Sequence, residues 1–144
     1  KTLVDEASHQ SNKLLESTGR LDIASLILSG SIVEGLYIST QLIKNYPEDT
    51  PAEIRDLILE PLIKVVIDQK EGLDNLIQIV KKFDNNQTLS SLLMELNKIK
   101  MIYDKELIEV SAQIASNKGD MMLQSKVLDH LTVEISRIRN SFVQ

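Results

Sequence analysis

The stretch Leu21–Tyr46, LDIASLILSGSIVEGLYISTQLIKNY, decides the fold, because it is about as apolar as a helix of a soluble protein can be. Its apolar residues occupy the whole helical circumference, which is typical of a helix that is buried on nearly all sides. Ser31, Gly35 and Ser39 recur every four residues and predict one face small enough for a neighbouring backbone to approach closely. We therefore expect a central helix with the other helices packed around it.

Residues 21–43 are also long enough to span a membrane, which takes about 20 apolar residues. Asp22, Glu34 and Gln41 argue against a span, because charged and strongly polar groups are unfavourable in the bilayer core. The neighbouring segments have the periodicity of amphipathic helices in soluble proteins. We therefore favour a core helix over a membrane span.

Apolar residues recur at helical spacing along the rest of the chain, between short polar connections. Gly19 can end a helix in a positive-φ conformation, and Thr50 and Thr88 are candidate N-caps. Pro61 predicts a kink or a short break, because it lacks an N–H group and its ring clashes with the preceding turn. Short connections make neighbouring helices antiparallel. The sequence predicts an all-α fold, an up-and-down antiparallel bundle forming a single domain (residues 1–144), with about five helices at about 2–18, 22–46, 51–83 (kinked near Pro61), 88–116 and 120–142.

The composition excludes several classes of function. The 144 residues include 16 Lys and Arg against 21 Asp and Glu, which gives a net charge of −5. Nucleic-acid binding needs a basic patch that neutralises phosphates, and no basic run is longer than Lys81-Lys82. The chain has no Cys, which excludes disulfides, thiolate catalysis and Cys-based metal sites. We therefore expect no nucleic-acid partner and no electrostatic attachment to an anionic membrane.

Glu34 is the most conspicuous polar residue, because it lies in the apolar stretch beside Gly30 and Gly35. A carboxylate in such a helix must be paired, hydrogen-bonded or protonated, since a bare buried charge is too unfavourable. The Tyr37 hydroxyl, one turn further on, is one candidate partner, and a Lys or Arg from another helix is the other. We favour a structural polar contact. The functional alternative is a ligand-binding or acid/base carboxylate, with Glu34, Tyr37, Gly30 and Gly35 as binding residues around a cavity.

Catalytic and metal-binding motifs are otherwise scarce. Glu6 and His9 have the Glu-x-x-His spacing of carboxylate-bridged di-metal bundles. Such a site needs a second copy, and His130 has Val127 rather than Glu three residues before it. The chain has no Gly-rich phosphate loop, nucleophile elbow or His-Glu-x-x-His motif. We therefore expect no enzymatic activity, metal or cofactor; the alternative is a metal-binding or enzymatic bundle that uses Glu6, His9 and Glu34.

Four segments carry a resemblance to a known family: Ser29–Thr40 (SGSIVEGLYIST), Gln69–Leu76 (QKEGLDNL), Leu92–Ile99 (LLMELNKI) and Ile135–Asn140 (ISRIRN). Together they resemble an uncharacterised family of bacterial helical proteins, many of which have lipoprotein-type signal sequences. The Gly-x-x-x-Glu-Gly-Leu-Tyr run in the first segment is the most specific feature. The resemblance implies an exported, periplasmic protein that is tethered to a membrane through a lipidated Cys upstream of Lys1. The alternative location is the cytoplasm.

Three hypotheses for the function follow from these observations. The favoured one is a non-enzymatic helical bundle of the cell envelope that binds a partner protein or a small ligand. The second is the metal-binding or enzymatic bundle described above. The third is a purely structural or oligomerising module.

Overall fold

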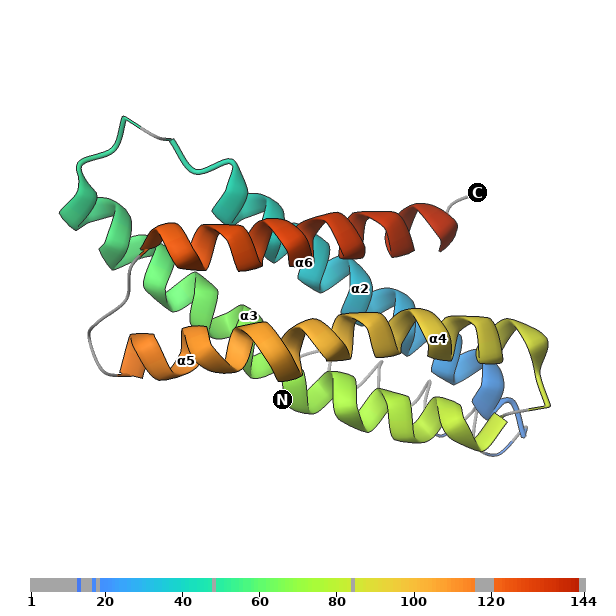
Figure 1. Cartoon of the computed structure of the whole chain (residues 1–144). Helices are drawn as coiled ribbons and strands as arrows, with labels where there is room; N and C mark the ends of the chain where they lie inside the picture. Colours follow the sequence, from blue (N-terminus) through green and yellow to red (C-terminus); the bar gives the residue numbers. More distant parts are fainter. Residues whose placement is uncertain are drawn as a thin grey trace.

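Helices make up most of the computed structural model, which describes residues 13, 17, 19–47, 49–83, 85–115 and 121–142 (Figure 1). Within these residues there is no β-strand, so the all-α prediction is confirmed. Most of the predicted helix at residues 2–18 lies outside the described residues. The helical elements are α2 (Leu21–Lys44), α3 (Ala52–Val80), a 3₁₀ turn (Lys81–Phe83), α4 (Gln87–Ile102), a π-helical segment (Tyr103–Leu107), α5 (Ile108–Ala115) and α6 (Met121–Phe142).

The long helices α2, α3, α4 and α6 run in alternating directions along the chain (Figure 1). The π-helical segment joins α4 and α5 into one long rod. Both α2 and α4 pack against the same two helices, α3 and α6. The apolar side chains enclosed between them form one cluster, which includes Leu36 of α2, Val66 of α3, Leu96 of α4 and Ile135 of α6. The finer prediction, about five helices in an up-and-down bundle, depends on residues 2–18 and stays a prediction.

Helix α2 is not enclosed on all sides, which corrects the expectation of a central buried helix. Its six buried residues form one stripe, the inner stripe of α2: Ser25, Ser29, Val33, Leu36, Thr40 and Ile43. Other large apolar residues of α2 face solvent: Leu21 (42% exposed), Ile27 (59%), Leu28 (42%), Ile38 (51%) and Leu42 (57%). By length and composition α2 alone among the described helices could cross a membrane, and 22% of its most apolar window is buried.

The small residues that allow close helix packing lie on the inner stripe, not on the predicted face. Ser25, Ser29 and Thr40 are at most 2% exposed, and each hydroxyl donates to the carbonyl four residues earlier, at 2.6–2.8 Å. Because these hydroxyls are satisfied within α2, neighbouring helices pack directly against them. Ser31 and Gly35 are exposed instead. The predicted close approach along Ser31 and Gly35 is therefore wrong for the described part of the chain.

Helix α3 continues through Pro61, so the predicted short break is absent. Pro61 is exposed. The helix starts also differ from the prediction, because Pro51 precedes α3 without a side-chain cap. At the start of α4, Asn86 rather than Thr88 is the N-cap, and its Oδ1 accepts a hydrogen bond from the Leu89 N–H at 3.2 Å. This bond satisfies one of the free N–H groups that every helix start exposes.

The π-helical segment places a buried tyrosine and an acidic residue side by side. Tyr103 is 1% exposed, and its hydroxyl donates to the Val66 carbonyl of α3 at 2.6 Å. Burial raises the pKa of the Tyr103 phenol, which keeps it protonated as a donor. A π turn contains one extra residue and so changes the direction of the side chains that follow it. Asp104, the next residue, faces α3 and joins a ring of charges there.

This ring of charges fixes α3 to the rod formed by α4 and the π-helical segment. Lys70 Nζ lies 2.6 Å from Asp74 and 3.0 Å from Asp104, and Lys100 Nζ lies 2.6 Å from Asp74 and 2.9 Å from Asp104. Hydrogen bonds from Lys100 and then Lys70 hold the pKa of both aspartates below the ordinary value. Each charge therefore contacts two charges of opposite sign, as expected for a structural network.

Candidate functional site

Glu34 is paired, as the favoured interpretation of a structural contact predicts. Its carboxylate accepts a hydrogen bond from Arg139 Nε of α6 at 2.6 Å, and the Arg139 guanidinium lies 4.4 Å from the centre of the Tyr37 ring. The Glu34 side chain is 45% exposed, so the residue lies at the surface seam between α2 and α6 rather than in the core. Arg139 thus combines a charge-assisted hydrogen bond with a cation–π contact, which ties α6 to α2.

Gly30 and Gly35 lie at open positions on α2. A Cβ added at either glycine would meet no described atom within 4 Å. The structure therefore brings Glu34 and Tyr37 together around Arg139, and it leaves the two glycines at open positions. A ligand-binding role for Glu34, Tyr37, Gly30 and Gly35 stays a prediction.

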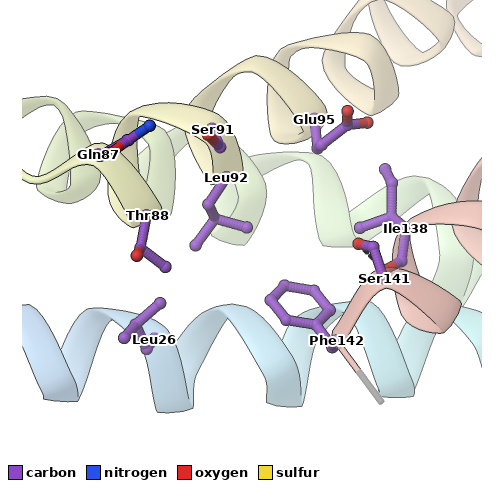
Figure 2. A pocket seen from close by; sticks show the side chains of 9 residues that line it. All are labelled: Leu26, Gln87, Thr88, Ser91, Leu92, Glu95, Ile138, Ser141 and Phe142. Atoms are coloured by element: carbon purple, nitrogen blue, oxygen red, sulfur yellow. Dashed lines mark hydrogen bonds between the residues drawn. The ribbon is translucent and has the colours of Figure 1, made fainter. Parts of the chain in front are cut away.

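A different cavity, of about 540 Å³, lies between α2, the start of α4 and the end of α6 (Figure 2). Figure 2 shows the side chains of Leu26, Leu92 and Phe142 converging on it from three helices. Its volume falls within the range of about 300–1,000 Å³ that is usual for small-molecule sites. The residues that line it are Leu26, Gln87, Thr88, Ser91, Leu92, Glu95, Ile138, Ser141 and Phe142.

The spacing of residues along α4 explains why both apolar and polar side chains of this helix line the cavity. Leu92 belongs to the buried stripe of α4 and is 6% exposed. Thr88, Ser91 and Glu95 are spaced by three and four residues, so they lie along one edge of the helix beside that stripe. On α6, Ser141 contributes a further hydroxyl, which donates to the Ile138 carbonyl at 2.6 Å. Hydroxyl groups and apolar side chains therefore line the cavity together.

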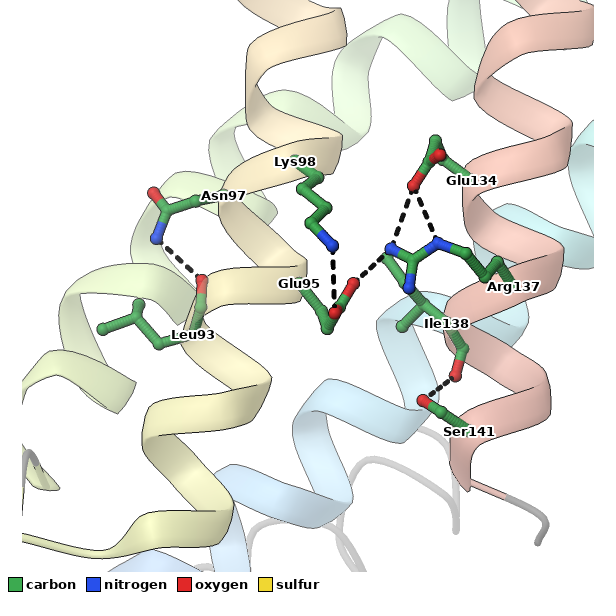
Figure 3. A network of polar contacts seen from close by, with 8 residues as sticks. All are labelled: Leu93, Glu95, Asn97, Lys98, Glu134, Arg137, Ile138 and Ser141. Carbon is green, nitrogen blue, oxygen red and sulfur yellow. Dashed lines mark hydrogen bonds and ion pairs between the residues drawn. The ribbon is translucent and has the colours of Figure 1, made fainter.

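Glu95 is the only charged residue among those that line the cavity, and its charge is balanced. Arg137 of α6 donates to one carboxylate oxygen of Glu95, and Lys98 Nζ lies 3.1 Å from the other (Figure 3). Arg137 also donates to Glu134 at 3.0 Å. The hydrogen bond from Arg137 is the main reason why the pKa of Glu95 lies below its ordinary value. Among the described residues, the cavity is thus lined by an ionised but paired carboxylate and by no cation that could receive an anionic ligand.

Two arginines hold the last turns of α6 on opposite sides of a buried residue. Arg137 reaches Glu95 of α4, Arg139 reaches Glu34 of α2, and Ile138 between them is fully buried and lines the cavity. The side chains of successive helical residues differ in direction by about 100°, so three consecutive residues can contact three different parts of the molecule. The two ion pairs keep α6 close to α2 and α4 beside the cavity. Neither arginine was among the predicted site residues, although the pattern Arg-Ile-Arg was a readable signal of this arrangement.

The chemistry of the cavity suits non-covalent binding. Its polar groups are hydroxyls, one amide and one paired carboxylate, with no nucleophile activated by a neighbouring base. The residues that the structure describes include no group of three or more His, Asp or Glu that could hold a metal ion. Glu6 and His9 of the alternative hypothesis lie outside the described residues. His130 contacts Glu106 instead, with 3.0 Å between Nδ1 and a carboxylate oxygen.

No protein-family model matches the chain, and no curated protein or solved structure matches it either. The resemblance to the bacterial helical family therefore stays a prediction.

Proposed function

We propose that the protein is a non-enzymatic helical binding module that holds a small, neutral, amphiphilic ligand in the cavity between α2, α4 and α6. The observation that carries this proposal is the cavity of about 540 Å³, which is lined by both apolar and hydroxyl-bearing side chains. Leu26, Leu92 and Phe142 contact the apolar part of the ligand. Thr88 and Ser91 hydrogen-bond its hydroxyl or amide group. Each buried CH₂ group contributes about 0.8 kcal/mol, so the apolar part supplies most of the affinity.

The charges around the cavity support a neutral ligand. Both cations nearest the rim, Arg137 and Lys98, already bind the carboxylate of Glu95. An anionic ligand would lie next to that carboxylate and would have to compete for its partners. A neutral ligand is not repelled by the Glu95 carboxylate and does not compete for its partners.

Titration of straight-chain 1-alcohols from hexanol to decanol into ¹⁵N-labelled protein tests this proposal. We expect saturable chemical-shift changes at the amides of Ser91, Leu92 and Ser141, with a Kd that falls as the chain lengthens. Ser91→Trp fills the cavity and raises the Kd at least about tenfold. Met94→Trp is the matched control, because Met94 is 67% exposed on α4 and does not line the cavity. Absence of saturable shifts, or equal binding of decanoate, contradicts the proposal.

We also propose that residues 2–18 form a fifth helix of an up-and-down bundle, and that the protein is exported and tethered to the membrane upstream of Lys1. The family resemblance and the apolar character of α2 support export. Fractionation of bacteria that express the natural gene tests the location. We expect the protein in the membrane fraction, with detergent required for its release. Recovery in the cytosol favours the cytoplasmic alternative.

The metal-binding alternative has less support, because Glu34, one of its three ligands, is bonded to Arg139. Elemental analysis of the purified full chain tests it directly. Iron, manganese or zinc at one or more equivalents per chain would favour that alternative over the binding module.

A further inference from the structure

Glu95 differs from the other residues that line the cavity between α2, α4 and α6, because it alone among them carries a charge. The remaining lining residues are apolar or carry a neutral hydroxyl or amide group. The Glu95 side chain is 25% exposed, so water screens its charge less than it screens a fully exposed one. The charge of a ligand in this cavity therefore acts first on the Glu95 carboxylate.

Two cations and a second carboxylate surround Glu95 (Figure 3). Arg137 of α6 donates to one carboxylate oxygen of Glu95, and Lys98 Nζ lies 3.1 Å from the other. Arg137 also donates to Glu134, from Nε at 3.1 Å and from one terminal nitrogen at 3.0 Å. Neither Arg137 nor Lys98 lines the cavity. These four side chains, which we call the Glu95 cluster, have two positive and two negative charges and are neutral as a group.

Neutralising Glu95 alone would change this balance. Gln has the length and shape of Glu, and its carbonyl oxygen still accepts a hydrogen bond. The Glu95 cluster would then have two cations against one carboxylate, a net charge of +1. Arg137 and Lys98 would lose the carboxylate that they share, and the carboxylate of a ligand beside residue 95 could take its place. Charge-assisted hydrogen bonds from a guanidinium to a carboxylate are among the strongest in proteins.

The alkyl chain of a ligand cannot produce a preference that depends on charge. Leu26, Leu92 and Phe142 offer the same apolar surface to 1-octanol and to octanoate, which have the same number of carbon atoms. Dehydrating the octanoate head group is equally unfavourable for every variant of the protein. A change in the ratio of the two Kd values between variants therefore reports the protein charges near the head group.

We propose that Glu95 is the specificity-determining residue of this cavity, and that it excludes carboxylates both by its own charge and by holding Arg137 and Lys98. This inference rests on the proposed binding of a neutral amphiphile, and it adds the residue that sets the preference. Arg137 and Lys98 are a latent anion-binding pair, which receives a ligand carboxylate only when residue 95 is neutral.

Titration of 1-octanol and of octanoate into ¹⁵N-labelled protein at pH 7 tests this role of Glu95. The measured quantity is the Kd of octanoate divided by the Kd of 1-octanol. We expect this ratio to fall at least about tenfold in Glu95→Gln relative to the unchanged protein. The variant should remain folded, because the loss of one partly exposed ion pair is small beside the stability of a domain. A disturbed fold would weaken the binding of both ligands together and leave the ratio unchanged.

Two further variants separate the charge of Glu95 from that of its neighbours. Glu134→Gln is the matched control, because Glu134 also bonds Arg137 but does not line the cavity. Its ratio should stay within about threefold of that of the unchanged protein, since Glu95 still holds both cations. In the double variant Glu95→Gln with Arg137→Gln, the cluster is neutral again, and the ratio should return to within about threefold of the original value.

The possible results distinguish this proposal from the binding module on which it rests. An unchanged ratio in Glu95→Gln, or an equal fall in Glu134→Gln, contradicts the role of Glu95 and leaves the binding of 1-octanol standing. A fall that persists in the double variant overturns the latent anion-binding pair, because Arg137 is then not the group that receives the carboxylate. Absence of saturable 1-octanol binding in the unchanged protein contradicts both proposals.

Discussion

The inner stripe of α2 and the exposed side of the same helix have similar apolar character, yet only the inner stripe is buried. We call this exposed side the outer face of α2; its residues are Leu28, Ser31, Gly35, Ile38 and Leu42. Leu36 on the inner stripe is fully buried, whereas Leu42 on the outer face is 57% exposed. Apolar composition therefore does not determine which side of a helix faces the core. Burial depends on where α3 and α6 lie, and those helices are placed by the short connections and by their own apolar stripes.

The seam between α3 and α4 differs from the outer face of α2 in another way. Four charged residues, Lys70, Asp74, Lys100 and Asp104, close this seam with ion pairs of 2.6–3.0 Å. No ion pair of the described residues involves the outer face of α2. Ion pairs with fixed geometry specify one partner for a seam, whereas an apolar face without ion pairs selects a partner only by complementary shape. The following predictions test these differences.

The largest expected effect comes from truncation of the inner stripe. Leu36→Ala leaves a cavity in a fully buried position and should lower the free energy of unfolding by about 2–5 kcal/mol. Leu42→Ala is the matched control on the outer face and should change it by no more than about 0.5 kcal/mol. Urea unfolding followed by circular dichroism measures both values. Equal losses for the two variants would show that the two sides of α2 are equally buried in solution.

An intermediate effect is expected when the small residues of the inner stripe are enlarged. Ser29 is fully buried against its neighbours, so Ser29→Leu should force them apart and destabilise the protein by about 1–3 kcal/mol. Ser39→Leu is the control, because the Ser39 hydroxyl bonds the Gly35 carbonyl on the exposed side of the helix. Its effect should stay within about 0.5 kcal/mol. The same unfolding assay separates the two, and a neutral Ser29→Leu would contradict close packing at this position.

The smallest effect concerns the ring of charges at low pH. Hydrogen bonds from Lys100 and Lys70 lower the pKa of Asp74 below its ordinary value of 3.8. The stability that Asp74 contributes is therefore complete above about pH 4 and is lost as the pH falls through the lowered pKa. Asp74→Asn should reduce stability at pH 7 by no more than about 1 kcal/mol, because the ring is partly exposed. The difference from the unchanged protein should then shrink as the pH falls below that range.

Asp68→Asn provides the control for this pH dependence, because Asp68 is exposed on the same helix. Its unfolding free energy should follow that of the unchanged protein from pH 7 to pH 3. If the difference in unfolding free energy between Asp74→Asn and the unchanged protein stays constant across this range, the stability that the ring contributes does not depend on the ionised carboxylate.

Helix content could be predicted from periodicity, because apolar residues at helical spacing depend on local geometry alone. The predicted start of α4 was close, but the capping residue was wrong. Asn86 and Thr88 are both good N-caps, and the choice depends on backbone conformation at the helix start. Similarly, Pro61 was predicted to kink or briefly break α3. The helix has no break there, because the proline lies at an exposed position that accommodates it.

The candidate site was harder to predict, because its residues come from three helices. The sequence predicted that Glu34 needs a partner, because a bare carboxylate in an apolar helix is unfavourable. It left open whether that partner is the Tyr37 hydroxyl or a Lys or Arg of another helix. The sequence could not show that Arg139 is the partner of Glu34. That contact depends on how α6 packs beside α2, and no local sequence pattern indicates this packing. The cavity residues Leu26, Leu92 and Phe142 resemble ordinary core residues in sequence. Only their arrangement shows that they leave a space.

The sequence by itself determined the helical class, the approximate helix limits and the absence of Cys chemistry, because each of these depends on residue identity and short-range spacing. The tertiary structure decided which side of α2 is buried, which arginine binds Glu34 and where a ligand-sized cavity lies. These features depend on contacts between residues far apart in the chain, such as the pair of Glu34 and Arg139. The periodicity of one helix shows which residues share a face, but the partner of that face is set by packing of the whole chain.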